Sequence, residues 1–233
     1  MTRLVLASAS PRRRELLGLL DLPFTVVEPD VDERATASPA RAKAVKVAQR
    51  GTATLAADTE IDLDGERLGK PRDAADAVAV LSRLAGRDHD VVTAVAVVDA
   101  SGGSFAFAVR SRVTMRAQDD AAIAAYVATG EPLDKAGAYA IQGAGGALVL
   151  RSDGCRANIV GLPLCHAHAA LRRAGVVTTE RPEAVCQRHF AFTCAVWRTA
   201  RAQGHALLSG ESHETAEGVR VAAITGRVRD LDP

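Results

Sequence analysis

Apolar residues in the first part of the chain alternate between short continuous runs and helical spacing. The runs Leu4 to Ala7 and Phe24 to Val27 have the length and composition of buried strands. Between them, the leucines from Leu16 to Leu20 are spaced as on one face of a helix. Ser10-Pro11 precedes this helix and supplies a capping hydroxyl and a proline at the first helical position. The pattern predicts a strand that passes into a helix with almost no loop.

The chain continues to alternate strands and helices. The helix-forming segment 40–50 stops at Gly51, and Asp64-Gly65 is typical of a hairpin turn. The further elements that the pattern predicts are a strand at 55–57, a helix at 74–86, strands at 91–98 and 104–115, a helix from 119 or 120 to 130, strands at 147–150 and 158–160, and a helix at 163–175. This order predicts an α/β fold, with a mixed twisted sheet flanked by helices.

The pattern weakens after about residue 177. Beyond it, charges are scattered, and the stretch from Phe190 to Ala202 is the one that fits a helix. We therefore expect a domain at residues 1–177 and a C-terminal extension of unknown structure at 178–233. The composition of the extension favours a partly ordered segment without chemistry of its own.

Composition and charge restrict the class of protein. The 233 residues are 48% hydrophobic but 3% aromatic, so the chain can bury a full core, which must be aliphatic. The net charge of +1 gives no overall attraction to nucleic acid or to an anionic membrane. We find no apolar run of about 18 residues and no secretory signal. These features predict a cytoplasmic protein that binds neither nucleic acid nor membrane.

The cysteines lie in the last third of the chain, at Cys155, Cys165, Cys186 and Cys194. None of them forms a C-x-x-C pair, and their spacing with the neighbouring histidines matches no standard zinc site. Buried thiols in a reducing compartment are the simpler interpretation, and a metal cluster is the alternative.

Charged residues cluster at the ends of the predicted elements. The start of the helix at Pro11 offers free backbone N–H groups to an anion, and Arg12 and Arg13 add guanidinium groups there. The other charged residues at element ends are Glu33, Lys43, Asp58, Lys70 and Lys135. Cations neutralise phosphate oxygens, and Mg²⁺ prefers one or two carboxylates together with substrate phosphate. This combination is what a metal-dependent reaction on a nucleoside triphosphate requires.

Other phosphate and hydrolase motifs are missing. The chain has no G-x-x-x-x-G-K-[ST] and no G-x-S-x-G. The glycines from Gly143 to Gly146 precede a predicted strand rather than a helix, which argues against a dinucleotide-binding fingerprint.

Several separated motifs occur in a fixed order over about residues 3–175. They are Ala7-Ser8-Ala9-Ser10-Pro11-Arg12-Arg13, Ala57-Asp58-Thr59, Gly69-Lys70-Pro71, the segment from Gly130-Glu131-Pro132 to Gln142-Gly143, and Gly161-Leu162-Pro163. In this order they resemble the Maf family of nucleoside triphosphate pyrophosphatases. The resemblance implies a fold related to the inosine triphosphatase group, a central nucleotide cleft, a divalent cation (Mg²⁺ or Mn²⁺) and a homodimer.

The resemblance also implies a reaction and its residues. A nucleoside triphosphate would be hydrolysed to the monophosphate and pyrophosphate, and the motif forms are similar to the branch that prefers dTTP and UTP. Asp58 would be the catalytic carboxylate and, with Glu33, a metal ligand. Base or substrate choice would fall to Arg12, Thr59 and Gln142, and phosphate binding to Ser8, Arg13, Lys43, Lys70 and Lys135.

The sequence departs from the family pattern at two places, and the first of them leaves a second function open. The segment between Glu33 and Lys43 is shorter than is usual in the family, and the polar Glu60-Ile61-Asp62 follows the Asp-Thr pair where an apolar strand is common. The alternative to the enzyme is therefore a catalytically weak, nucleotide-binding regulator of cell division or septum formation. The alternatives for Glu60 are a second metal site and exposure to solvent.

Overall fold

A computed structural model of the protein describes residues 2–33, 35–200, 202, 213–214, 220–221 and 224–227. Its strands are β1 (Arg3–Ala7), β2 (Phe24–Val27), β3 (Thr52–Leu63), β4 (Glu66–Leu68), β5 (Asp88–Val98), β6 (Gly103–Met115), β7 (Val149–Asp153), β8 (His213–Glu214), β9 (Arg220–Val221) and β10 (Ile224–Arg227). The helices are α1 (Pro11–Gly18), α2 (Pro39–Val47), α3 (Ala74–Leu84), α4 (Asp120–Val127), α5 (Arg156–Val160), α6 (Leu164–Arg173) and α7 (Pro182–Phe190), and the 3₁₀ segments are η1 (Glu131–Asp134), η2 (Ala136–Ala138) and η3 (Ala144–Leu148).

The main sheet is mixed, as the alternation of elements predicts. Its strand order is β10-β6-β5-β3-β1-β2, with β4 paired to β3 and β7 paired to β6. Strand β1 runs parallel to β2 and β3, and the remaining pairs are antiparallel. Ala7, the last residue of β1, lies opposite Val27 on one side and Ala56 on the other. The segments that follow β1 and β2 therefore both begin at the carboxyl ends of these strands, beside the middle of the longer strand β3.

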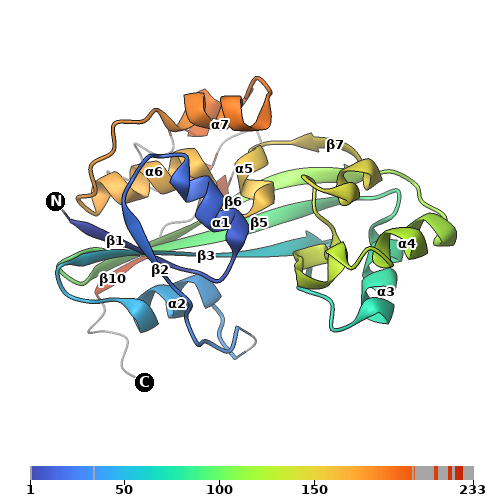
Figure 1. Cartoon of the computed structure of the whole chain (residues 1–233), viewed down its shortest axis with the longest axis horizontal. Helices are drawn as coiled ribbons and strands as arrows, with labels where there is room; N and C mark the ends of the chain where they lie inside the picture. Colours follow the sequence, from blue (N-terminus) through green and yellow to red (C-terminus); the bar gives the residue numbers. More distant parts are fainter. Residues whose placement is uncertain are drawn as a thin grey trace.

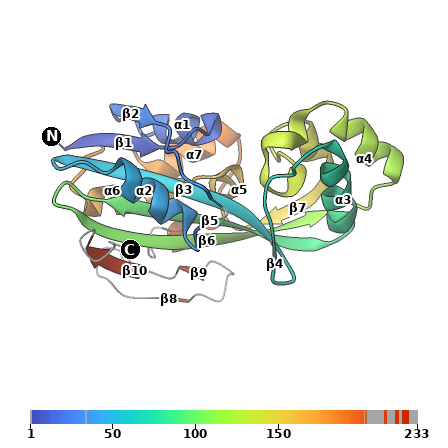
Figure 2. The same ribbon diagram turned by 90° about the horizontal axis from the view of Figure 1, so that it is seen from below.

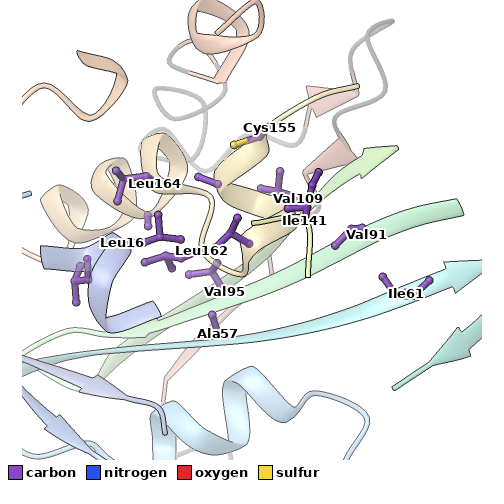
Figure 3. Packing of buried hydrophobic residues seen from close by; sticks show 14 of the residues in the cluster. Leu16, Ala57, Ile61, Val91, Val95, Val109, Ile141, Cys155, Leu162 and Leu164 are labelled. Atoms are coloured by element: carbon purple, nitrogen blue, oxygen red, sulfur yellow. The ribbon is translucent and has the colours of Figure 1, made fainter. Parts of the chain in front are cut away.

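Helices cover both faces of this sheet. Figure 1 shows α1, α5, α6 and α7 on one face and α2 on the other. The larger core is aliphatic, as the composition predicts, and Figure 3 shows Leu16, Leu162 and Leu164 packed above Ala57 and Val95 of the sheet. A smaller cluster under α2 is built of alanines and one valine, namely Ala7, Ala40, Ala44, Ala56, Ala96 and Val98.

The long strands β3, β5 and β6 join two ends of the molecule. Helices α3 and α4 gather with β4 and β7 at the end away from β1 and β2, which Figures 1 and 2 show from two directions. The β3–β4 hairpin at this end turns at Asp64 and Gly65, whose φ angles are +54° and +89°. Two successive residues with positive φ are what a tight hairpin turn requires, so the predicted turn is confirmed.

The predicted corner between the first strand and helix is also confirmed. Strand β1 ends at Ala7 and α1 begins at Pro11. Ser10 is the N-cap, and its Oγ accepts a hydrogen bond of 3.4 Å from the backbone N–H of Arg13.

Three predicted strands need correction. Residues 158–160 belong to helix α5, because the buried Asn158 amide donates 3.0 Å hydrogen bonds to Val91 O and Ser111 Oγ, which fixes this segment over the sheet. The predicted strand at 147–150 begins only at Val149, after η3. The strand predicted at 55–57 runs from Thr52 to Leu63, because its polar residues 58–62 also pair with β5.

The beginning of the C-terminal extension packs against the rest of the chain. Helix α7 ends at Phe190, where Ala191 adopts φ of +51°, so the stretch predicted as one helix from Phe190 to Ala202 is interrupted at its start. Within this stretch, the described residues 197–200 and 202 are helical, so the prediction is correct only for its last part. Val185 and Cys186 of α7 belong to the main hydrophobic core. Strand β10, near the end of the chain, pairs with β6.

The four cysteines are free thiols, and burial raises the pKa of Cys155 to about 11 and that of Cys186 to about 12. Among the residues that the structure describes, no three or more His, Cys, Asp or Glu side chains are arranged to hold a metal ion. The alternative of a cysteine–histidine metal cluster is therefore not supported there. A search of the same residues finds no helix with the length and apolar character needed to cross a membrane.

His89 of β5 makes folding stability depend on pH. It is 3% exposed, shares a 2.8 Å hydrogen bond with the hydroxyl of Tyr139, and burial lowers its pKa from 6.5 to about 4. His89 in the unfolded chain binds a proton more readily than His89 in the folded protein. The contribution of the neutral imidazole to stability is therefore complete above about pH 6.5 and is lost as the pH falls toward 4.

We expect the wild type to lose about 2 kcal/mol more free energy of unfolding than His89→Gln between pH 7 and pH 4.5. Urea unfolding of both proteins at the two pH values measures this difference. Equal losses in the two proteins would show that His89 does not titrate in this way.

Candidate active site

One large cleft collects every site residue that the sequence analysis selects. Its volume is about 1220 Å³, and it lies along the middle of β3, between the β1–α1 corner and the far end of the molecule. The selected residues that line it are Ser8, Arg12, Arg13, Glu33, Lys43, Asp58, Thr59, Lys70, Lys135 and Gln142. Residues separated by up to 134 positions in the chain therefore line one cleft.

Lys43 lies at the centre of the charged wall. Its side chain is 6% exposed, and its Nζ is 2.6 Å from Glu33 Oε1 and 2.8 Å from Asp58 Oδ1. Burial alone would raise the pKa of Glu33, but the hydrogen bond and charge of Lys43, with the charges of Lys70 and Arg13, outweigh burial and lower it. The ammonium group thus holds two carboxylates side by side and favours the ionised form of Glu33.

Arg13 connects the first helix to the sheet. Its Nε donates to Gly161 O at 2.9 Å, and its Nη2 donates to Thr59 Oγ1 at 3.0 Å. The Thr59 hydroxyl also lies 3.0 Å from Thr93 Oγ1, its partner on β5. Burial lowers the pKa of Arg13, against the charges of Asp58 and Glu33, which favour its cationic form. Arg13 therefore contributes a fixed positive charge whose direction is set by two hydrogen bonds.

The β1–α1 corner supplies polar backbone and hydroxyl groups next to this charge. Ser8 is 3% exposed, and its Oγ accepts a 3.2 Å hydrogen bond from the N–H of Ser10. Arg12 points along the cleft towards Asp134, with 3.9 Å between its Nη1 and the carboxylate Oδ2. The capping role expected for Ser10 is thus confirmed, while Ser8 and Arg12 are available on the cleft wall.

The opposite wall comes from the segments around Lys70, Lys135 and Gln142. Lys135 Nζ donates to the main-chain oxygen of Glu131 at 2.9 Å, and it also pairs with Asp134. Gln142 is exposed and lies in a short turn before η3. This wall offers two ammonium groups and one amide, a set that suits phosphate oxygens and the edge of a base.

Glu60 lines the cleft on the same strand as Asp58, and sequence reasoning gave it no settled role. Its Oε1 is 3.3 Å from Arg67 Nε, on the hairpin strand β4. Burial raises the pKa of Glu60, Arg67 opposes this shift, and the nearby charges of Asp58 and Asp62 add to it. The ion pair with Arg67 forms because of the register between β3 and β4. This register cannot be predicted from the separate sequence motifs.

The pair Glu33 and Asp58 fits a divalent cation. Both carboxylates contact the same ammonium nitrogen, so they already converge on one point of the cleft wall. Mg²⁺ and Mn²⁺ bind oxygen ligands, and Mg²⁺ needs only one or two carboxylates when substrate phosphate and water complete its coordination. The donor set is therefore suitable for a cation that enters together with a polyphosphate.

The sequence of this chain matches a known family over most of its length. Residues 3–174 match the family described as Maf-like protein. The chain belongs to the Maf family. It is 53% identical over 186 residues to a protein of Myxococcus xanthus (strain DK1622) named dTTP/UTP pyrophosphatase, which covers 75% of this chain and 94% of that protein.

Two further Maf relatives carry the same name. A protein of Anaeromyxobacter dehalogenans (strain 2CP-C) is 51% identical over 183 residues, covering 74% of this chain and 94% of its own. One from Geotalea uraniireducens (strain Rf4) is 46% identical over 188 residues, covering 76% and 97%. The family match ends at residue 174, so α7 lies beyond it.

The shortened segment before α2 does not separate the charged residues of this Maf protein. Glu33 and Lys43 are in direct contact, and Lys43 also reaches Asp58. Helix α2 begins at Pro39, and Lys43 lies one turn later on the buried face of the helix, with Ala40 and Ala44. The short segment therefore leaves these side chains in contact.

Removing the charge of Lys43 should change the titration of its neighbour. We expect Lys43→Gln to raise the pKa of Glu33, because the substitution deletes the hydrogen bond and the positive charge that hold it down. A ¹³C NMR titration of the carboxylates measures this change. The matched control is Lys46→Gln, an exposed lysine on the same helix; equal Glu33 titration in the two variants would contradict the assignment.

Proposed function

We propose that this protein hydrolyses nucleoside triphosphates to the monophosphate and pyrophosphate, with dTTP and UTP as its preferred substrates. The observation that supports this most is the contact of Lys43 with both Glu33 and Asp58 in a cleft lined by arginines and lysines. The substrate choice is supported by the names of the relatives, which reach 53% identity.

Binding of the triphosphate is the task we assign to the basic residues. Arg13 and Lys43 lie on one wall and Lys70 and Lys135 on the other, so a polyphosphate between the walls meets positive charge on both sides. The backbone N–H groups at the start of α1 add donors for an anion at the same corner. These contacts fix the reacting phosphate groups beside Asp58.

Asp58 is the group we assign to activate water. Its carboxylate accepts a proton while the water oxygen forms a bond to phosphorus, and the bridging bond between the α- and β-phosphates breaks. Pyrophosphate then leaves with the electron pair of that bond. Glu33 and Asp58 would hold a divalent cation, which would neutralise the charge that develops on the phosphate oxygens.

Base selection is the task we assign to Gln142, at the other end of the cleft, together with Arg12 and Thr59. The Gln142 amide both donates and accepts hydrogen bonds, which matches the edge of a pyrimidine. Thr59 contributes through Arg13, because its hydroxyl is already bound to that guanidinium and to Thr93. The metal requirement, the homodimer and the cytoplasmic location remain predictions.

A catalytically weak, nucleotide-binding regulator of cell division or septum formation is the less favoured alternative. Its basis was the short segment between Glu33 and Lys43, and the two side chains nevertheless meet at 2.6 Å. Three relatives that align with this chain over 94% or more of their own length are named dTTP/UTP pyrophosphatase.

Replacing Asp58 tests the proposed role of the carboxylate. We expect Asp58→Asn to lower kcat for pyrophosphate release from dTTP by about 10²–10⁴-fold, because the amide cannot accept the proton of water. Binding of a non-hydrolysable dTTP analogue, measured by calorimetry, should persist. Asp62→Asn is the matched control, on the same strand but paired with Arg110. Near wild-type turnover by Asp58→Asn would contradict the assignment.

A further inference from the structure

Glu131 accepts hydrogen bonds on both of its carboxylate oxygens. Its Oε1 accepts from the Tyr126 hydroxyl at 2.8 Å and from the N–H of Gly145 at 3.1 Å, and its Oε2 accepts from the N–H of Ala144 at 3.0 Å. Burial alone would raise the pKa of Glu131, but these donors and the charge of Lys135 outweigh burial and lower it. The side chain is thus an ionised acceptor that binds the backbone of a single turn.

That turn is residues 140–146, and it carries Gln142. The Tyr126 hydroxyl accepts from the N–H of Ala140 at 3.2 Å, so the first residue of the turn is fixed by the same pair that fixes Ala144 and Gly145. Within the turn, the N–H of Gly143 donates to Ala140 O at 3.2 Å. Glu131 and Tyr126 therefore hold the backbone on both sides of Gln142.

The glycines of the turn fit closely around these two side chains. A Cβ on Gly143 would lie 2.3 Å from Glu131 Oε2, and one on Gly145 would lie 2.5 Å from the Tyr126 hydroxyl. Neither distance leaves room for a methyl group. The glycine-rich sequence that follows Gln142 thus allows the backbone to approach Glu131 closely enough for both N–H bonds to form.

Lys135, which we assign to phosphate binding, contacts Glu131 through its main chain. Lys135 Nζ binds the main-chain oxygen of Glu131, at 2.9 Å, and not its carboxylate. A change restricted to the carboxylate therefore leaves this hydrogen bond of Lys135 in place. This separation allows the two ends of the cleft to be tested independently.

We propose that Glu131 is a positioning residue for base selection: its carboxylate, together with Tyr126, fixes the 140–146 turn so that the Gln142 amide meets the base of the bound nucleotide. The inference rests on the proposed function, because it assigns the end of the cleft at Gln142 to the base. Glu131 itself is not among the residues that line the cleft. Its removal loosens recognition of the base while leaving phosphate binding unchanged.

The test compares Glu131→Gln and Tyr126→Phe with the wild type in steady-state hydrolysis of UTP and GTP. Loss of one or two charge-assisted hydrogen bonds should lower kcat/KM for UTP by roughly 5–30-fold, mostly through KM. The value for GTP should change little, so the UTP/GTP ratio should fall by a similar factor. Inhibition by inorganic pyrophosphate, which has no base, should stay as in the wild type. Glu66→Gln, an exposed glutamate paired with Arg83, is the control for loss of one carboxylate.

Gly143→Ala disrupts the same contact from the other side. The new methyl group displaces the Glu131 carboxylate, so this variant should reproduce the fall in the UTP/GTP ratio, and the double variant with Glu131→Gln should show little further loss. Equal loss of activity on all nucleotides and weaker pyrophosphate inhibition would overturn the proposal in favour of a general structural role, and an unchanged ratio would overturn it as well. If the wild type releases no pyrophosphate from any nucleotide, the proposed function fails before the variants are compared.

Discussion

The buried ammonium group of Lys43 is the contact on which the arrangement of the cleft depends. A charge with 6% of its side chain exposed is costly unless counter-charges lie close to it, and here they come from two separate parts of the chain. Glu33 follows β2, and Asp58 lies in the middle of β3. Pairing both with one lysine joins α2, the loop before it and the sheet, and it leaves two carboxylates at the position where a polyphosphate would enter.

The parallel strands explain why these groups meet. Since β1 lies between β2 and β3, the segments that leave β1 and β2 emerge beside the part of β3 that continues past them. Arg13 then links this edge to the helical layer through Gly161, and Thr59 and Thr93 extend the link across β3 and β5. The cleft is thus built on rigid strands, while Lys70, Lys135 and Gln142 approach from segments at the far end of the molecule.

Sequence reasoning succeeded where local chemistry decides the structure. The cap at Ser10 and the turn at Asp64-Gly65 follow from side-chain and backbone preferences within a few residues, and both are present. It failed at residues 158–160, where contacts of Asn158 with distant strands override an apolar pattern that resembles a strand. All ten residues selected from the family motifs line one cleft in the structure. The motifs did not reveal that Glu131 supports the turn that carries Gln142. Its partners lie up to 14 positions away, and no periodicity or spacing marks them.

The central claim is that this cleft cleaves nucleoside triphosphates between the α- and β-phosphates. It is tested most directly by incubating the purified protein and Mg²⁺ or Mn²⁺ with dTTP, UTP, CTP, ATP and GTP in turn and separating the products by anion-exchange chromatography. The account predicts nucleoside monophosphate and pyrophosphate in equal amounts, formed fastest from dTTP and UTP. Release of nucleoside diphosphate and phosphate, or tight nucleotide binding without any product, would contradict it.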